Sequence, residues 1–157
     1  MLRQVVEEVS LQTCDERTIN KGGLSMREIL FRGKNKLTDG WCEGYLVKTG
    51  DHFRISTQND FISFGVDPST VGQYTGLKDR NGVRIFEGDV VQEHHETIWV
   101  DSWGKKHTVY MDEERRGWYP FACGDGCGCC EEDTISPCYC EVVGNIYDNP
   151  ELLEVPS

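Results

Sequence analysis

Short apolar stretches follow one another along the chain and are separated by turn-forming residues about every ten positions. Most of the stretches are rich in aromatic and β-branched residues, and no apolar periodicity of helical length interrupts them after the first residues. We therefore expect β-strands at residues 28–32, 41–47, 53–55, 61–66, 71–77, 83–86, 90–99, 107–111, 118–121 and 141–147. This spacing is typical of a sandwich or barrel of short strands.

Residues 66–91, VDPSTVGQYTGLKDRNGVRIFEGDVV, contain the densest turn signals in the chain. Asp67-Pro68-Ser69 predicts a turn, because proline fixes one backbone angle and its neighbours can hydrogen-bond the local backbone. Asn81-Gly82 is the pair that most readily adopts the left-handed angles of a tight hairpin. Gly88-Asp89 then interrupts the second strand of that hairpin. A break of this kind suits the corner of a small barrel.

The two ends of the chain have patterns of their own. Apolar residues recur at helical spacing between Leu2 and Val9, and residues 15–25 form a polar connector that contains glycine. Residues 1–25 are therefore an N-terminal extension, helical or disordered, which is either an oligomerisation arm or a tail added by an upstream start codon. At the other end, Asn149-Pro150 favours a final helical turn. Residues 26–157 are expected to form one β domain.

The chain is acidic, with 27 Asp and Glu against 16 Lys and Arg and a formal net charge of −11. Nucleic-acid binding needs clustered basic residues to neutralise phosphates, and here they are scattered, so nucleic acid is not an expected partner. No apolar run approaches the roughly 18 residues of a membrane span. The first residues lack the features of a signal peptide. We expect a cytoplasmic protein whose acidic surface promotes solubility.

A cysteine-rich loop, CGDGCGCCEEDTISPCYC, covers residues 123–140. Cys127 and Cys130 form a C-x-x-C pair, and Cys138 and Cys140 form a C-x-C pair shortly after it. Four thiolates so placed could bind one structural zinc ion, with no open position for catalysis. The short second spacing departs from the usual zinc ribbon, so reduced thiols in an inserted loop, or disulfides, are the alternatives. If Tyr139 lies in a strand, Cys138 and Cys140 point to the same face.

Two further groups of residues could carry chemistry. His94 and Glu96 would share one strand face, and His107 on the returning strand could complete a catalytic metal site, although polar residues on a wet strand face explain the pattern more simply. An activated cysteine is the second, but Cys14 and Cys42 have no neighbouring histidine. The chain contains no nucleophile elbow, phosphate-binding loop or dinucleotide fingerprint. We therefore expect a protein that is not an enzyme.

The aromatic residues allow two interpretations. They could form a stacking surface for single-stranded nucleic acid, but no basic groove accompanies them. Core packing and a subunit interface explain them more simply. The residues concerned are Trp41, Tyr74, Trp99, Trp103, Trp118 and Tyr119.

Three blocks of the chain resemble the signature blocks of the YopX family, which consists of small proteins encoded by bacteriophages and prophages. The blocks are MREILFRGK at 26–34, VGQYTGLKDRNGVRIFEGDVV at 71–91 and VVGNIYDNPELLE at 142–154, and they occur in the family's order. The resemblance implies a β-rich domain with an SH3-like roll or barrel that self-associates. It implies no activity and no catalytic residue.

These observations predict a mostly β fold, a small SH3-like roll or barrel with an N-terminal β arm and a short C-terminal helical segment. The function that we expect is that of a non-enzymatic phage or prophage accessory protein, which acts through protein–protein contacts as a homo-oligomer and binds an unidentified phage or host protein. One alternative is an acidic mimic that occupies the basic groove of a host nucleic-acid-binding protein. Another is a barrel that binds single-stranded nucleic acid.

Overall fold

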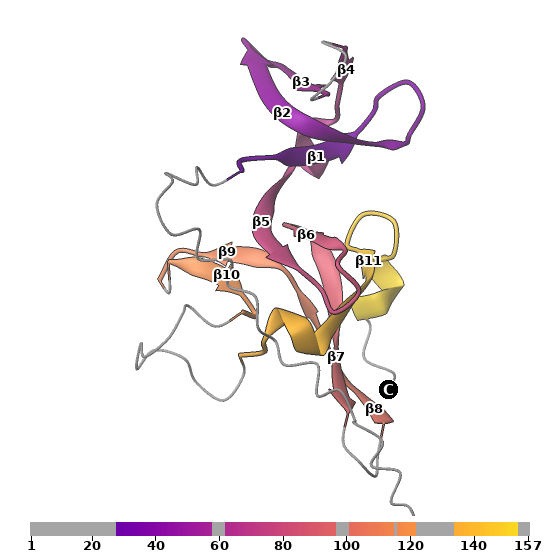
Figure 1. Ribbon diagram of the computed structural model, residues 1–157. Coiled ribbons are helices and arrows are strands. Elements are labelled where there is room, and N and C mark those ends of the chain that lie inside the picture. Colours follow the sequence, from indigo (N-terminus) through magenta and orange to yellow (C-terminus); the bar gives the residue numbers. More distant parts are fainter. Residues whose placement is uncertain (1–27, 58–61, 97–100, 115, 122–133, 154–157) are drawn as a thin grey trace, which may run out of the picture.

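The structure, a computed structural model, describes residues 28–57, 62–96, 101–114, 116–121 and 134–153, and this part of the protein is mostly β, as predicted (Figure 1). The strands are β1 (Phe31–Lys34), β2 (Trp41–Thr49), β3 (His52–Ser56), β4 (Ser63–Gly65), β5 (Gly72–Lys78), β6 (Arg84–Phe86), β7 (Asp89–Glu96), β8 (Asp101–Thr108), β9 (Tyr110–Asp112), β10 (Gly117–Tyr119) and β11 (Cys140–Asn145). Single 3₁₀ turns are η1 (Pro68–Thr70), η2 (Pro137–Tyr139) and η3 (Pro150–Leu153).

The described strands pair in three antiparallel sheets, in the orders β4-β3-β2-β1-β5-β6, β11-β7-β8 and β10-β9. The predicted hairpin at Asn81-Gly82 joins β5 to β6, and the predicted break at Gly88, which has a φ of 83°, separates β6 from β7. The predicted SH3-like barrel is not seen among these strands. The first sheet ends at the short strand β6, and β7 instead pairs with β8 and β11, so the described sheets remain open.

The main core lies in the lower part of the molecule in Figure 1, which we call the body and define as β5 to β11. Its largest cluster joins side chains from β6, β7, β10, β11 and the segments between them, namely Ile85, Val91, Val109, Trp118, Phe121 and Cys140. A smaller cluster, formed by Leu30, Tyr74 and Phe86, lies where β1 meets β5 and β6. The alternating apolar residues of the 71–91 block therefore supply both clusters.

Strands β2, β3 and β4 form an arm that stands away from the body and is joined to it through β1 (Figure 1). The apolar side chains on one face of the arm pack against one another, and Ile55 and Val66 are fully buried there. Gly33 in β1 faces these two side chains, and a Cβ atom at this position would lie 3.1 Å from the Cβ of Val66. The arm therefore has a small core of its own.

Several local predictions differ from the structure. Residues 101–105, which lie between the strands predicted at 90–99 and 107–111, belong to β8, which pairs with β7 through a register shift between Gln92 and His94. The expected C-terminal helical segment is only the four-residue 3₁₀ turn η3. Residues 1–25 and most of the cysteine loop lie outside the described residues. No helix in the described part is long and apolar enough to cross a membrane.

Candidate functional site

The turn between β5 and β6 is held by Asp79, whose side chain is almost completely buried. Its Oδ1 atom accepts hydrogen bonds from the backbone N–H groups of Asn81 at 2.8 Å and Val83 at 2.9 Å. Its Oδ2 atom accepts a third from the N–H of Val142 in β11, at 3.0 Å. A carboxylate that accepts several backbone hydrogen bonds can remain buried without a cation. Asp79 thus fixes the hairpin and ties it to β11.

A second buried carboxylate, Asp89, fixes the orientation of Arg32. Asp89 is 1% exposed, accepts a hydrogen bond from the N–H of Phe86 at 2.7 Å and forms an ion pair with the guanidinium of Arg32. Burial raises the pKa of the Asp89 carboxyl, and Arg32 and the Phe86 N–H oppose that shift. The guanidinium also lies 4.7 Å from the ring centre of Trp41 and 5.0 Å from that of Phe86. Arg32 is therefore rigidly held where β1 meets the body.

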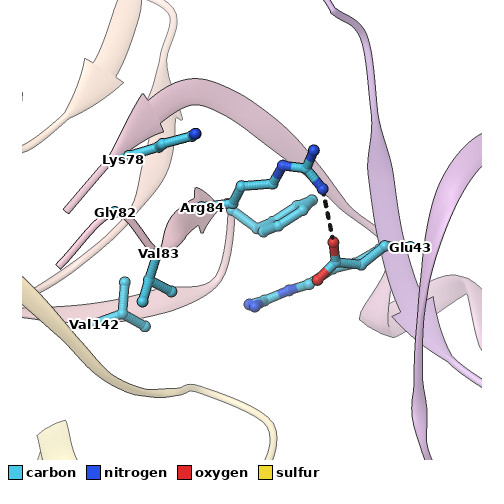
Figure 2. Close-up of a pocket in the computed structure, with 8 residues that line it drawn as sticks. Glu43, Lys78, Gly82, Val83, Arg84 and Val142 are labelled. Carbon is cyan, nitrogen blue, oxygen red and sulfur yellow. Dashed lines mark ion pairs between the residues drawn. The ribbon is translucent and has the colours of Figure 1, made fainter.

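Beside Arg32 is a pocket of about 420 Å³ (Figure 2). Arg84 reaches across it, and its guanidinium pairs with Glu43 at 3.5 Å and with Glu28 at 3.9 Å. Lys78 lies beside Arg84, because the hairpin sets these two residues opposite each other. The residues that line the pocket are Arg32, Glu43, Lys78, Gly82, Val83, Arg84, Phe86 and Val142.

The pocket has a charged part and an apolar part. Figure 2 shows Arg84 and Glu43 on one side and Val83 and Val142 on the other. Three cations and one carboxylate line it, and two further carboxylates, Asp89 and Glu28, pair with Arg32 and Arg84, so the charges of the whole group balance. Guanidinium groups bind carboxylate and phosphate oxygens, so the arrangement is suited to an anion attached to an apolar group.

No motif in the sequence marks these basic residues as a site. The predicted hairpin gives one indication of the site, because a turn at 79–82 places Lys78 and Arg84 opposite each other. Nothing local indicates the contribution of Arg32, because its partner Asp89 lies 57 residues away in the chain.

Of the four predicted zinc ligands, Cys127 and Cys130 lie outside the described residues. Cys138 and Cys140 do not share a strand face, because Pro137 starts the 3₁₀ turn η2 and only Cys140 enters β11. Cys138 is disulfide-bonded, so it could become a zinc ligand only after reduction. Cys140 is free and buried in the main core, and burial raises the pKa of its thiol to about 12. The structural zinc stays a prediction.

The structure separates the two predicted histidine ligands. The side chain of His94 is buried against the guanidinium of Arg80, whereas His107 pairs with Glu93 at 2.8 Å. The other ring nitrogen of His107 lies 3.2 Å from the hydroxyl of Tyr119. The register shift between Gln92 and His94 places the two histidines in different networks. In the described part of the chain, no group of three or more His, Cys, Asp or Glu could hold a metal ion.

The described aromatic residues do not gather on one surface. Tyr74 and Trp118 are buried in different core clusters. Trp41 contacts Arg32 and Tyr147, and its indole N–H donates to Asp148 at 2.7 Å. These positions indicate packing roles and give no support to a stacking surface for nucleic acid.

The arm has an exposed outer face, which we define as Tyr45, Val47, Arg54, Ser56 and Ser63. Strand pairing sets Tyr45 opposite Ser56, Val47 opposite Arg54, and Ser56 opposite Ser63. Tyr45 and Val47 are 50% and 44% exposed. The Arg54 guanidinium donates to the hydroxyl and the carbonyl oxygen of Ser63, both at 2.9 Å, and so links β3 to β4. The five residues of the face therefore combine apolar groups with polar ones, and the exposed Glu43, two residues before Tyr45 on β2, borders them on the same side.

Comparison with known proteins identifies a family and solved structures of similar fold. No curated protein matches the chain. The crystal structure of protein EF1440 from Enterococcus faecalis is similar over 82% of this chain and 100% of its own, with 23% sequence identity and a TM-score of 0.46. A family model described as "YopX protein" matches residues 24–154. The match covers all three blocks noted in the sequence.

Proposed function

The chain belongs to the YopX family, and from that premise we propose that it is a non-enzymatic accessory protein that acts through protein–protein contacts, as a homo-oligomer whose copies meet at the outer face of the arm. The observation that carries the proposal is the pair of exposed apolar side chains on that face, Tyr45 and Val47. They lie two residues apart on β2 and so point to the same side. A second copy of this arm is the occupant that we propose for the face.

The distribution of charge supports a second copy over other occupants. Two chains that each carry a net charge of −11 repel each other, and the repulsion is least where neither presents a carboxylate. None of the five residues of the outer face is acidic, although Glu43 borders them on the same side of β2 and Asp51 lies in the turn after β2. Contact through this face therefore lets two copies approach without opposing their acidic surfaces.

The edge of the arm supports the same proposal. Strand β4 is the last strand of the six-stranded sheet (Figure 1), and on its far edge the carbonyl oxygen of Gly65 accepts a hydrogen bond from the N–H of Lys36, while no described strand pairs with the rest of that edge. Unpaired strand edges expose backbone hydrogen-bonding groups that a second copy can satisfy. A contact that covers the outer face and this edge together would bury both features.

The cellular setting in the proposal comes from the family resemblance. It implies a phage- or prophage-encoded protein in the cytoplasm of a bacterial cell, with a phage or host protein as a further partner. The contacts of His107 support the proposal that the protein is not an enzyme, because both of its ring nitrogens already contact Glu93 and Tyr119.

Sedimentation velocity on two matched variants tests the proposal. Val47→Glu places a carboxylate on the outer face, and we expect it to convert the oligomer into monomers through charge repulsion between copies. Met111→Glu is the control, because Met111 is 42% exposed, close to the 44% of Val47, but lies on β9 in the body.

The wild-type chain and the Met111→Glu variant should sediment as the same oligomer, and all three proteins should keep the same circular dichroism spectrum. A wild-type chain that stays monomeric at high micromolar concentration would overturn the proposal and favour the acidic mimic. Dissociation by Met111→Glu alone would place the interface on the body instead.

A further inference from the structure

We propose that the pocket between β2, β5, β6 and β11 binds a phosphomonoester of about nucleotide size, with the phosphate at Arg84, Lys78 and Arg32 and the rest of the ligand against Val83 and Val142. This inference is independent of the proposed oligomer, because the pocket lining and the outer face of the arm share no residue.

The Arg84 side chain is held only weakly by its present partners and can bind an incoming anion. Its two ion pairs, at 3.5 Å to Glu43 and 3.9 Å to Glu28, are long, and its side chain is 40% exposed. Exposed pairs of this kind contribute little to stability. An incoming anion can therefore replace Glu43 as the partner of Arg84 without disturbing the fold.

The Arg32 side chain is held in one orientation beside the pocket. Its Nη2 atom pairs with Asp89, and its plane is fixed by Trp41 and Phe86. A guanidinium has five N–H donors, so a pairing through one nitrogen leaves others for a ligand. An arginine that is already ordered loses little conformational entropy when it binds.

The charges and the volume of the pocket together indicate the kind of ligand that it can hold. Asp89 and Glu28 pair with the lining residues Arg32 and Arg84, so the three cations and three carboxylates balance, and the negatively charged phosphate must bind by replacing Glu43 and Glu28 at Arg84, with Lys78 beside it. A volume of about 420 Å³ lies in the range of small-molecule sites and leaves room for more than a phosphate group. The valine side chains can contact the remainder of such a ligand (Figure 2).

Isothermal titration calorimetry with adenosine 5′-monophosphate as the probe tests this site, with adenosine and inorganic phosphate as reference ligands. We expect the monophosphate to bind more tightly than either reference. Arg84→Gln should weaken its binding roughly tenfold, since it removes a charge-assisted contact. Lys78→Gln, at an exposed position, should weaken binding as well. Glu43→Gln should strengthen binding about threefold, because it removes the carboxylate that competes for Arg84.

Arg54→Gln is the control for a general loss of positive charge, because Arg54 lies on the outer face of the arm and does not line the pocket. It should leave the affinity unchanged. Equal losses in Arg84→Gln and Arg54→Gln, or a monophosphate that binds no better than adenosine, would overturn the site. Inorganic phosphate that binds as tightly as the monophosphate would overturn the role of Val83 and Val142.

Discussion

The body and the arm differ in how completely each covers its own apolar residues. In the body, Ile85, Val90 and Val91 are fully buried, and the turn beside them is held by the buried Asp79. In the arm, Ile55 is fully buried on one face, while Tyr45 and Val47 on the other face are about half exposed. The body thus buries a large core, although Val83, Tyr110 and Met111 on its surface are 42–48% exposed, whereas the arm has only a small core beneath its exposed outer face.

This difference indicates where the protein makes contacts with other molecules. A three-stranded unit with one covered face is close to the lower limit of independent stability, and the exposed face gains free energy when a partner covers it. We propose protein contacts at the arm, whose small core gives it the least stability by itself, and small-molecule binding in the pocket, where the arm's base meets the body.

The largest effect that separates the two regions is expected from Asp79→Ala. The substitution leaves the N–H groups of Asn81, Val83 and Val142 without their acceptor in a buried turn. We expect a loss of about 3 kcal/mol in the free energy of unfolding of the whole chain. Urea denaturation followed by circular dichroism measures it. The control, Asp51→Ala in an exposed turn of the arm, should change that free energy by less than about 0.5 kcal/mol, and equal values for the two variants would contradict the contrast.

A smaller and local effect is expected from Gly44→Ala in β2. A Cβ atom at this position would lie 2.0 Å from the carbonyl oxygen of Ser56 in β3, so the two strands must move apart. We expect a cost of about 1–3 kcal/mol that is confined to the arm. In hydrogen exchange, amides of β2 and β3 should exchange faster while those of β7 and β11 keep their protection.

Gly65→Ala is the matched control for that variant. Gly65 lies in β4 of the same arm, and no atom comes within 4 Å of a Cβ atom placed there. Its exchange pattern should match that of the wild-type chain. If Gly44→Ala accelerated exchange in the body as strongly as in the arm, the two regions would unfold as one unit.

The smallest effect concerns Asp148, which joins the arm's base to the end of the body. Its carboxylate accepts hydrogen bonds from Trp41 and Asn145 and pairs with Lys34 at 2.5 Å. The hydrogen bond from Lys34, followed by those from Asn145 and Trp41, lowers the pKa of Asp148 from 3.8 to about 2. A lowered pKa in the folded state means that this contribution is present above pH 3.8 and is lost as the pH falls toward 2.

Asp148→Asn tests that linkage. Because Asp148 is partly exposed, we expect its contribution to shift the melting temperature by only about 2–4 °C. Thermal melts between neutral pH and pH 2 should show a shallower decline in the Asp148→Asn variant than in the wild-type chain. Identical slopes would show that the contacts with Lys34 and Trp41 do not persist in solution.

Local sequence signals predicted the parts of the fold that depend on backbone angles. Gly82 and Gly88 lie at the turns that the sequence predicts and have φ angles of 81° and 83°, which few other residues adopt without strain, whereas Asn81 does not take a positive φ. The segment 101–105 has the composition of a turn, but its pairing with β7 makes it a strand. Here a contact made elsewhere in the chain overrode local preference.

The candidate site is harder to predict from the sequence than the turns are, because its residues come from segments that lie far apart in the chain. Arg32 and Asp89 belong to two different blocks of the chain, and only the fold brings them together. The cysteine spacing predicted that Cys138 and Cys140 could point to the same strand face. Pro137 indicates a different local structure, because proline favours the first position of a helical turn. The open shape of the sheets follows from long-range pairing in the same way.

The most direct test of the central claim, that copies of the chain meet at the arm, is hydrogen exchange measured by mass spectrometry at low and at high protein concentration. We expect amides in β2, β3 and β4 to exchange more slowly at the higher concentration, because association covers the outer face and the edge of β4. Amides in β7, β8 and β11 should show no such dependence. Exchange that is independent of concentration throughout, or protection gained only in the body, would contradict the account.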